Sequence, residues 1–212
     1  MRHRFALDLY LVTDRLMCAA LGIERVVAEA VAGGVTMVQL RDDDTPTAEL
    51  IAVARGLRAF LATTGVPLVV NNRVDVAVAA AADGLHVGQG DLPAAAARAA
   101  IGPDAILGLS ITDPDQLAPV DAAVVDYLGV GPIFATTTKL DAAPVMGLAG
   151  LAAVRARTHL PIVAIGGLSL ANAEATIRAG ADGIAVVSAI CTSADPRTAA
   201  QALARTVRAG KG

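Results

Sequence analysis

Residues 82–91 read ADGLHVGQGD, a segment that joins a short, largely apolar run to a polar, glycine-rich turn. The run Gly84–Val87 has the length of one strand, and the turn follows it directly. A second ADG, at residues 181–183, precedes another apolar run. Runs of this kind are typical of parallel strands that are covered on both faces. The segment therefore predicts a buried parallel strand that ends in polar residues.

The same pattern recurs on both sides of this segment. Short β-branched runs alternate with longer Ala-rich stretches that carry helix signals. The signals are Thr45-Pro46 before a helix expected at 48–62, Asp113-Pro114 before the fifth helix, Ser169 before a helix expected at 170–178 and Asp195-Pro196 before the last helix. Eight runs in 212 residues give about 26 residues per unit, close to one strand, one helix and two short loops. We therefore predict an α/β fold with one domain over residues 1–212, a single (β/α)8 TIM barrel. The predicted strands are 7–13, 36–40, 68–71, 84–87, 105–109, 127–130, 162–165 and 183–187.

A doubly wound open sheet uses the same alternation and is the main structural alternative. The strand predicted at 7–13 does not open a G-x-G-x-x-G turn, and the sequence has no G-x-x-x-x-G-K-[ST] segment. Gly129-Val130-Gly131 is followed by Pro132 and Ile133, which differs from the dinucleotide fingerprint. The strand count favours the barrel.

The composition excludes several classes of protein. Hydrophobic residues make up 55% of the chain, too many for a disordered protein. Only 2% of the residues are aromatic, the net charge is -3 and the pI is about 5.5, which argues against a nucleic-acid partner or a polybasic membrane contact. An anionic ligand would have to be bound by a local pocket.

The mean hydropathy of +0.58 raises the question of a membrane segment. No run reaches the roughly 18 uncharged apolar residues of a spanning helix, and Asp8, Asp14 and Arg15 interrupt the first apolar segment, so we expect no signal peptide. Cys18 and Cys191 cannot form a disulfide framework. We expect a cytoplasmic protein. Its Ala-rich shell with few aromatics offers no obvious hot-spot cluster for a partner protein, and the sequence does not define an oligomeric state.

Catalytic groups of a TIM barrel lie at the carboxyl ends of its strands. Seven of the predicted strands end in, or run directly into, polar or glycine-rich segments, so these segments would converge on one mouth. These residues are QLRDDD at 39–44, NNR at 71–73, GQGD at 88–91, Ser110, GPIFATTTK at 131–139, Gly166-Gly167 and Val187-Ser188.

The chain contains, in this order, the segments VQLRDDD, VNNRVDVA, ADGLHVGQGDLP, DYLGVGPIFATTTK, IVAIGGL and ADGIAVVSAI. Together they resemble the thiamine-phosphate synthase (thiamine-phosphate pyrophosphorylase) family, whose nearest relatives are thiazole tautomerases. The resemblance extends from about Leu9 to the last helix. It implies a transferase that condenses 4-amino-5-hydroxymethyl-2-methylpyrimidine diphosphate with hydroxyethylthiazole phosphate, giving thiamine phosphate and pyrophosphate. In that family pyrophosphate leaves first, and the thiazole nitrogen captures the pyrimidinyl-methyl cation.

The resemblance also implies roles for single residues on the pyrimidine diphosphate. Arg41 and Lys139 would bind the diphosphate, Arg41 as a planar fork and Lys139 as a point charge. With Ser110 they are the implied catalytic residues. Gln39, Asn71 and Ser110 would orient the pyrimidine and its diphosphate. A solvated surface cation is the alternative interpretation of Lys139, and a satisfied loop residue that of the Gln and Asn.

Magnesium is the implied cofactor, with Asp91 and Asn72 at the positions of its ligands. Asp91 could equally cap the helix predicted near Pro93. The thiazole phosphate would contact hydroxyls and backbone amides of the threonine run and a glycine-rich cradle after the last two strands. The implied contacts are Thr136, Thr137, Thr138, Gly167, Val187 and Ser188.

Two positions depart from the family pattern. Asp43 stands where the family usually has a lysine, and Asn72 where it usually has a second aspartate. The first change puts an anion beside the expected diphosphate, and the second replaces a charged metal ligand by a neutral one. We therefore hypothesise that Asp43, or Asp42 or Asp44 beside it, takes part in holding magnesium. A solvated acidic loop is the alternative.

Two other functions stay open at this point. A thiazole tautomerase is expected to carry a histidine two residues after Ser110, where this chain has Thr112. His86 is the only histidine near the predicted barrel, and a core or supporting role fits it better than proton transfer. A non-catalytic barrel that binds a phosphorylated small molecule is the third candidate.

Overall fold

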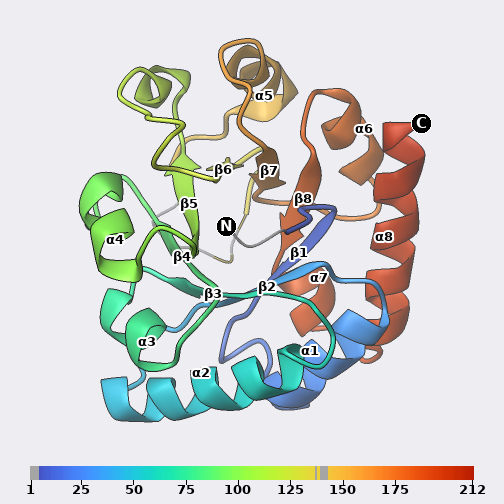
Figure 1. Cartoon of the computed structure of the whole chain (residues 1–212). Coiled ribbons are helices and arrows are strands. Elements are labelled where there is room, and N and C mark those ends of the chain that lie inside the picture. Colours follow the sequence, from blue (N-terminus) through green and yellow to red (C-terminus); the bar gives the residue numbers. More distant parts are fainter. Residues whose placement is uncertain (1–4, 137, 139–142) are drawn as a thin grey trace.

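The computed structural model describes residues 5–136, 138 and 143–212. In this part of the chain eight parallel strands close into a barrel in sequence order, and helices surround it (Figure 1). The predicted TIM barrel is confirmed. The strands are β1 Leu9–Val12, β2 Met37–Leu40, β3 Leu68–Asn71, β4 Gly84–Val87, β5 Ile106–Ile111, β6 Tyr127–Val130, β7 Ile162–Ile165 and β8 Gly183–Val186.

Successive residues of each strand point alternately into the barrel and outward to the helices. On β1, Leu9 and Leu11 belong to the large cluster that packs strands against helices, whereas Tyr10 and Val12 belong to a smaller cluster inside the barrel. Both faces of the strands are therefore buried. This explains why the strands are recognisable in the sequence as short, largely apolar runs.

The helices follow the predicted positions with one exception. The fifth was expected after Asp113-Pro114, but the structure forms only a 3-10 helix there, η1 Pro114–Leu117. Asp113 caps it by accepting the amide of Asp115, and a second proline, Pro119, prevents its continuation as an α-helix. The helices are α1 Ile23–Ala32, α2 Thr47–Leu61, α3 Val74–Ala79, α4 Ala94–Ile101, α5 Gly147–Arg155, α6 Ala173–Arg178, α7 Ser188–Cys191 and α8 Pro196–Lys211.

A repeated pair of hydrogen bonds, which we call a clamp, lies at the amino end of each even-numbered strand. In each clamp, the residue just before the even-numbered strand forms two hydrogen bonds with a residue at the start of the preceding, odd-numbered strand. Asp126 Oδ2, before β6, accepts the amide of Leu107 at 2.8 Å, and the Asp126 amide donates to the Leu107 carbonyl at 2.8 Å. Arg98 of α4 completes the clamp with an ion pair of 2.5 Å to Asp126. Each clamp joins two neighbouring strands before they run toward the mouth.

Three other pairs repeat this clamp. Asp83 with Leu68, Asp182 with Ile162 and Thr36 with Leu9 make the same two bonds. Arg58 and Arg155 pair with the two aspartates. The two ADG motifs of the sequence supply two of these aspartates, so the motif marks a structural clamp at the end of the barrel that lies away from the predicted site.

Among the described residues, no helix combines the length and the apolar composition that crossing a membrane requires.

Candidate functional site

The carboxyl ends of the strands surround a cavity of about 590 Å³. Residues from distant parts of the sequence meet there, because every parallel strand of the barrel ends at the same mouth. Thr137 and Lys139 lie outside the described residues. The other residues predicted for the site all line this cavity: Gln39, Arg41, Asp43, Asn71, Asn72, Asp91, Ser110, Thr136, Thr138, Gly167, Val187 and Ser188.

Five polar side chains cross the interior below the mouth as a series of hydrogen bonds, which we call the tyrosine–histidine chain. Gln39 Nε2 donates to Tyr10 Oη at 2.9 Å, and Tyr10 Oη lies 2.9 Å from Tyr127 Oη. Tyr127 Oη lies 2.9 Å from His86 Nδ1, and His86 Nε2 lies 2.9 Å from Ser110 Oγ. The chain thus links the cavity lining on β2 to that on β5, two strands that are not neighbours in the barrel.

Glycines inside two strands make room for these rings. A Cβ at Gly108 of β5 would collide with the Tyr127 ring and with His86 Nδ1, and a Cβ at Gly129 of β6 would lie 2.9 Å from His86 Cε1. Strand glycines usually weaken a sheet, so their presence indicates that another group needs the space. Here that space holds the centre of the tyrosine–histidine chain.

Burial keeps the side chains of the tyrosine–histidine chain uncharged at neutral pH. The His86 side chain is almost fully buried, and desolvation lowers the pKa of its imidazole to about 4. Desolvation also raises the pKa of the Tyr10 and Tyr127 hydroxyls. His86 is therefore a neutral ring with one donor nitrogen and one acceptor nitrogen. This geometry agrees with a supporting role for His86.

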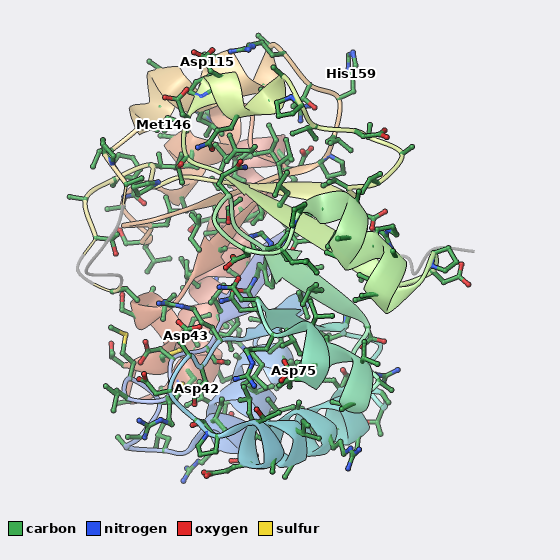
Figure 2. All side chains as sticks on the ribbon, turned by 90° about the vertical axis from the view of Figure 1, so that its left-hand side faces the viewer. Asp42, Asp43, Asp75, Asp115, Met146 and His159 are labelled. Atoms are coloured by element: carbon green, nitrogen blue, oxygen red, sulfur yellow. The ribbon has the colours of Figure 1, made fainter. Side chains whose placement is uncertain are left out.

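The carboxylates of the acidic run after β2 have different partners. Figure 2 labels Asp42 and Asp43. The Asp42 carboxylate accepts the amides of Asp44 and Thr45 and, at 2.7 Å, the Thr45 hydroxyl. Burial raises the pKa of Asp42, but the hydrogen bonds from Thr45 and Asp44 and the charge of Arg15 together outweigh burial, so that its pKa is lowered overall. Asp43 lines the cavity instead, with Oδ2 3.8 Å from Arg41 Nε. Of Asp42 and Asp43, the latter is therefore the one that faces the site.

Asp91 and Asn72 bring further oxygen donors to the same cavity. Asp91 Oδ2 accepts the amide of Gly88 at 2.7 Å and so holds the loop after β4, whereas Pro93 is the N-cap residue of α4. Asp91 is therefore not the helix cap. Asn72 has a left-handed backbone with a φ of 56°, which asparagine tolerates better than most residues. Carboxylate and amide oxygens suit Mg²⁺, which commonly completes its octahedron with water and substrate phosphates. The donor types of Asp91 and Asn72 therefore fit this ion, although the described residues contain no group of three or more His, Cys, Asp or Glu side chains placed to hold a metal.

The opposite part of the mouth is built by the ends of β6, β7 and β8. Gly166 and Gly167 have φ values of 97° and 64°, and a Cβ on Gly167 would lie 2.8 Å from the Phe134 Cβ. Both glycines are therefore required for the close approach of the β7 and β6 loops. Thr138 donates its amide to Thr136 Oγ1 at 3.2 Å, which folds the β6 loop. Val187 and Ser188 follow β8 and lead into α7.

Sequence reasoning missed Tyr10 and Tyr127 as part of the site. Both are aromatic residues within short strands, and such residues usually belong to the hydrophobic core. The sequence contains one signal for Tyr127, because Gly108 interrupts the neighbouring strand β5 at the point where a Cβ would meet the Tyr127 ring. No comparable signal marks Tyr10.

Comparisons with known proteins identify relatives of this chain by sequence and by structure. A family model described as thiamine monophosphate synthase matches residues 9–190. A thiamine-phosphate synthase of Xanthobacter autotrophicus is 55% identical over 207 residues, which cover 98% of each chain. Another, of Azorhizobium caulinodans, is 52% identical over 203 residues, 96% of each chain. The solved structure of a thiamine phosphate pyrophosphorylase from Pyrococcus furiosus superposes with a TM-score of 0.88 at 35% identity and covers 97% of this chain and 98% of its own.

Proposed function

This chain belongs to the thiamine-phosphate synthase family, and from that membership we propose how its cavity carries out the reaction. The enzyme is a transferase of thiamine biosynthesis that joins 4-amino-5-hydroxymethyl-2-methylpyrimidine diphosphate to hydroxyethylthiazole phosphate. The products are thiamine phosphate and pyrophosphate. The observation that supports our assignment of roles is that all the described residues at the predicted positions line one cavity.

The pyrimidine diphosphate binds over β2 to β5. Arg41 presents its guanidinium to the diphosphate, where a planar fork can make two charge-assisted hydrogen bonds. Gln39, Asn71 and Ser110 orient the pyrimidine through their polar atoms. Lys139 would add a second cation, and because it lies outside the described residues its role stays a prediction from the sequence.

The thiazole phosphate binds over β6 to β8. Thr136 and Thr138 offer hydroxyls, and Gly167, Val187 and Ser188 form the wall that a phosphate group would contact. Glycine at position 167 allows the backbone to approach an anion closely. Phosphorylated groups at the two ends of the cavity would place the two reacting atoms between them.

The reaction follows a dissociative substitution. The carbon–oxygen bond to the diphosphate breaks, its electron pair leaves with pyrophosphate, and the thiazole nitrogen lone pair forms the new carbon–nitrogen bond. Arg41 stabilises the charge that develops on the leaving group. Asp91 and Asn72, together with Asp43 of the same cavity lining, would hold Mg²⁺, which would supply further charge neutralisation at the diphosphate.

A direct assay tests the activity. Purified protein is incubated with both substrates and magnesium, and thiamine phosphate is measured by chromatography, with each substrate omitted in turn as the control. We expect product only in the complete mixture. Conversion of a thiazole isomer without condensation would instead indicate a tautomerase, and binding of either phosphate without turnover would indicate a non-catalytic barrel. Location in the cytoplasm stays a prediction.

A further inference from the structure

The tyrosine–histidine chain has a direction, and its Gln39 end fixes that direction. Gln39 Nε2 donates to Tyr10 Oη, so the Tyr10 oxygen already accepts one hydrogen bond. Tyr10 is 1% exposed, and its single proton has Tyr127 Oη as the remaining partner that the described residues offer. If Tyr127 donated instead, the Tyr10 proton would be buried without an acceptor, which is unfavourable. Tyr10 therefore donates to Tyr127.

The same reasoning carries the direction to the other end of the chain. Tyr127 is fully buried, accepts from Tyr10 and has one proton, which it gives to His86 Nδ1. A neutral imidazole that accepts at Nδ1 carries its own proton on Nε2. The Nε2 proton then points to Ser110 Oγ, 2.9 Å away. Each hydroxyl oxygen of the chain thus accepts from the residue before it.

We propose that this one-way chain holds His86 as the Nε2–H tautomer and makes it a positioning residue for Ser110, whose hydroxyl proton is directed into the cavity. Because the Ser110 oxygen accepts from His86, its own proton is available to the substrate. The substrate atom that meets Ser110 must then be a hydrogen-bond acceptor, either a phosphate oxygen or a ring nitrogen. This inference rests on the proposed function, in which Ser110 contacts the pyrimidine diphosphate.

The surroundings of His86 support a fixed tautomer. The ring lies between Tyr127 and Ser110, and it fills the space left by Gly108 and Gly129. The ring is buried, which disfavours the charged form, and only the neutral ring can accept at one nitrogen and donate at the other. The chain crosses from β2 through β1, β6 and β4 to β5, so the position of Ser110 depends on residues distant in sequence.

Nitrogen NMR of the histidine rings tests the tautomer without any activity. The protein has three histidines, and the His86→Gln variant identifies the signals of residue 86. We expect a neutral ring whose protonated nitrogen correlates with both carbon-bound ring protons, as Nε2 does. A proton on Nδ1 would mean that the chain runs in the opposite direction, with the Gln39 amide turned over, and would overturn the proposal.

Two variants separate positioning from a general effect on the fold. Tyr127→Phe keeps the ring but removes the donor to Nδ1, so we expect the Nδ1 signal to move toward that of a nitrogen without a hydrogen bond. Ser110→Ala is the matched variant, and it should move the Nε2 signal instead. An Nδ1 signal that stays in place in Tyr127→Phe would also overturn the proposal.

Kinetics provide the functional readout. In Tyr127→Phe we expect kcat/KM for the pyrimidine diphosphate to fall on the order of tenfold, as for the loss of one hydrogen bond, with little change in the KM for the thiazole phosphate. Equal losses for both substrates would indicate a structural defect and contradict positioning. If the unmodified protein forms no thiamine phosphate, the proposed function fails, while the NMR measurement still decides the tautomer.

Discussion

The Asp43 carboxylate lies 3.8 Å from the Arg41 guanidinium in the lining of the cavity, so an anion stands next to the cation that we assign to the diphosphate. The Asp43 side chain is 56% exposed, which leaves it free to turn toward a cation brought by the substrate. Asp42 has no such freedom, because Thr45 and the Asp44 amide hold its carboxylate. Neither Asp42 nor Asp44 lines the cavity. Of the three carboxylates in the acidic run, Asp43 is therefore the one for which we keep the magnesium hypothesis as a prediction.

For Asp43→Ala we expect the magnesium concentration that gives half-maximal activity to rise several-fold, because a negatively charged oxygen ligand is lost. The measurement is a magnesium titration of thiamine phosphate formation at saturating substrates. Asp44→Ala serves as the control, since Asp44 is the exposed neighbour and should leave the titration unchanged. An identical titration for Asp43→Ala and the unmodified protein would remove Asp43 from the magnesium site.

Stability should depend on pH through His86. Its pKa is lowered from 6.5 to about 4, so the unfolded chain binds the proton more readily than the folded one between these values. The contribution of the buried neutral His86 ring to the free energy of unfolding is fully present above about pH 6.5 and is lost as the pH falls toward 4. Tyr127, the titratable group that faces the ring, stays uncharged in this range because its pKa is raised.

Urea unfolding of the unmodified protein and of His86→Gln measures this effect. Between about pH 7 and about pH 5 we expect the unmodified protein to lose about 2 kcal/mol more unfolding free energy than the variant, which lacks the titrating ring. Equal pH slopes for the two proteins would mean that His86 is not buried in its neutral form.

Gly108→Ala should damage the site and the fold together. The added methyl group would collide with Tyr127 and His86, and overpacking of this kind costs about 1–3 kcal/mol or more. Gly56→Ala is the matched control, because Gly56 lies on the exposed side of α2 with nothing within 4 Å of the new Cβ. There alanine should stabilise the helix by about 0.5–1 kcal/mol. Thermal unfolding of both variants checks the opposite signs.

The clamps should differ in strength according to their burial. The Asp126 side chain is 6% exposed and that of Asp182 is 52% exposed, although both accept a strand amide and pair with an arginine. Asp126→Asn leaves the Arg98 charge buried and should cost about 3–5 kcal/mol, whereas Asp182→Asn should cost at most about 1 kcal/mol. Urea unfolding compares the two. A similar loss in both would show that burial does not set the strength of the clamp.

The strands were predictable because both of their faces are buried. The predictions for 68–71, 84–87, 127–130 and 162–165 match the structure residue for residue, since proline, glycine or polar residues bound these short runs. The helix expected after Asp113-Pro114 was wrong, because the start signal is genuine but Pro119 ends the segment after one turn.

The outline of the site was predictable for a different reason. Arg41 follows β2, Asn71 ends β3 and Ser110 lies near the end of β5. Parallel strands of a barrel bring such residues to one mouth. Tyr10 and Tyr127 were not predictable in this way. Their polar atoms meet across the barrel, and a sequence pattern records the spacing along one strand but not the pairing of hydroxyl groups between strands.

The recurring clamps give the barrel a modular construction. Within the described residues, each clamp ties an odd-numbered strand to the even-numbered strand that follows it, as Asp126 ties β6 to β5. The molecule can therefore be read as two-stranded modules arranged in a ring, with the clamps on one rim and the chemistry on the other. A circular permutant whose new termini lie in a loop between two modules would keep both strands of every clamp next to each other in the sequence. Loops within a module would be the poorer choice, because the two halves of a clamp would then meet only after the ring had closed.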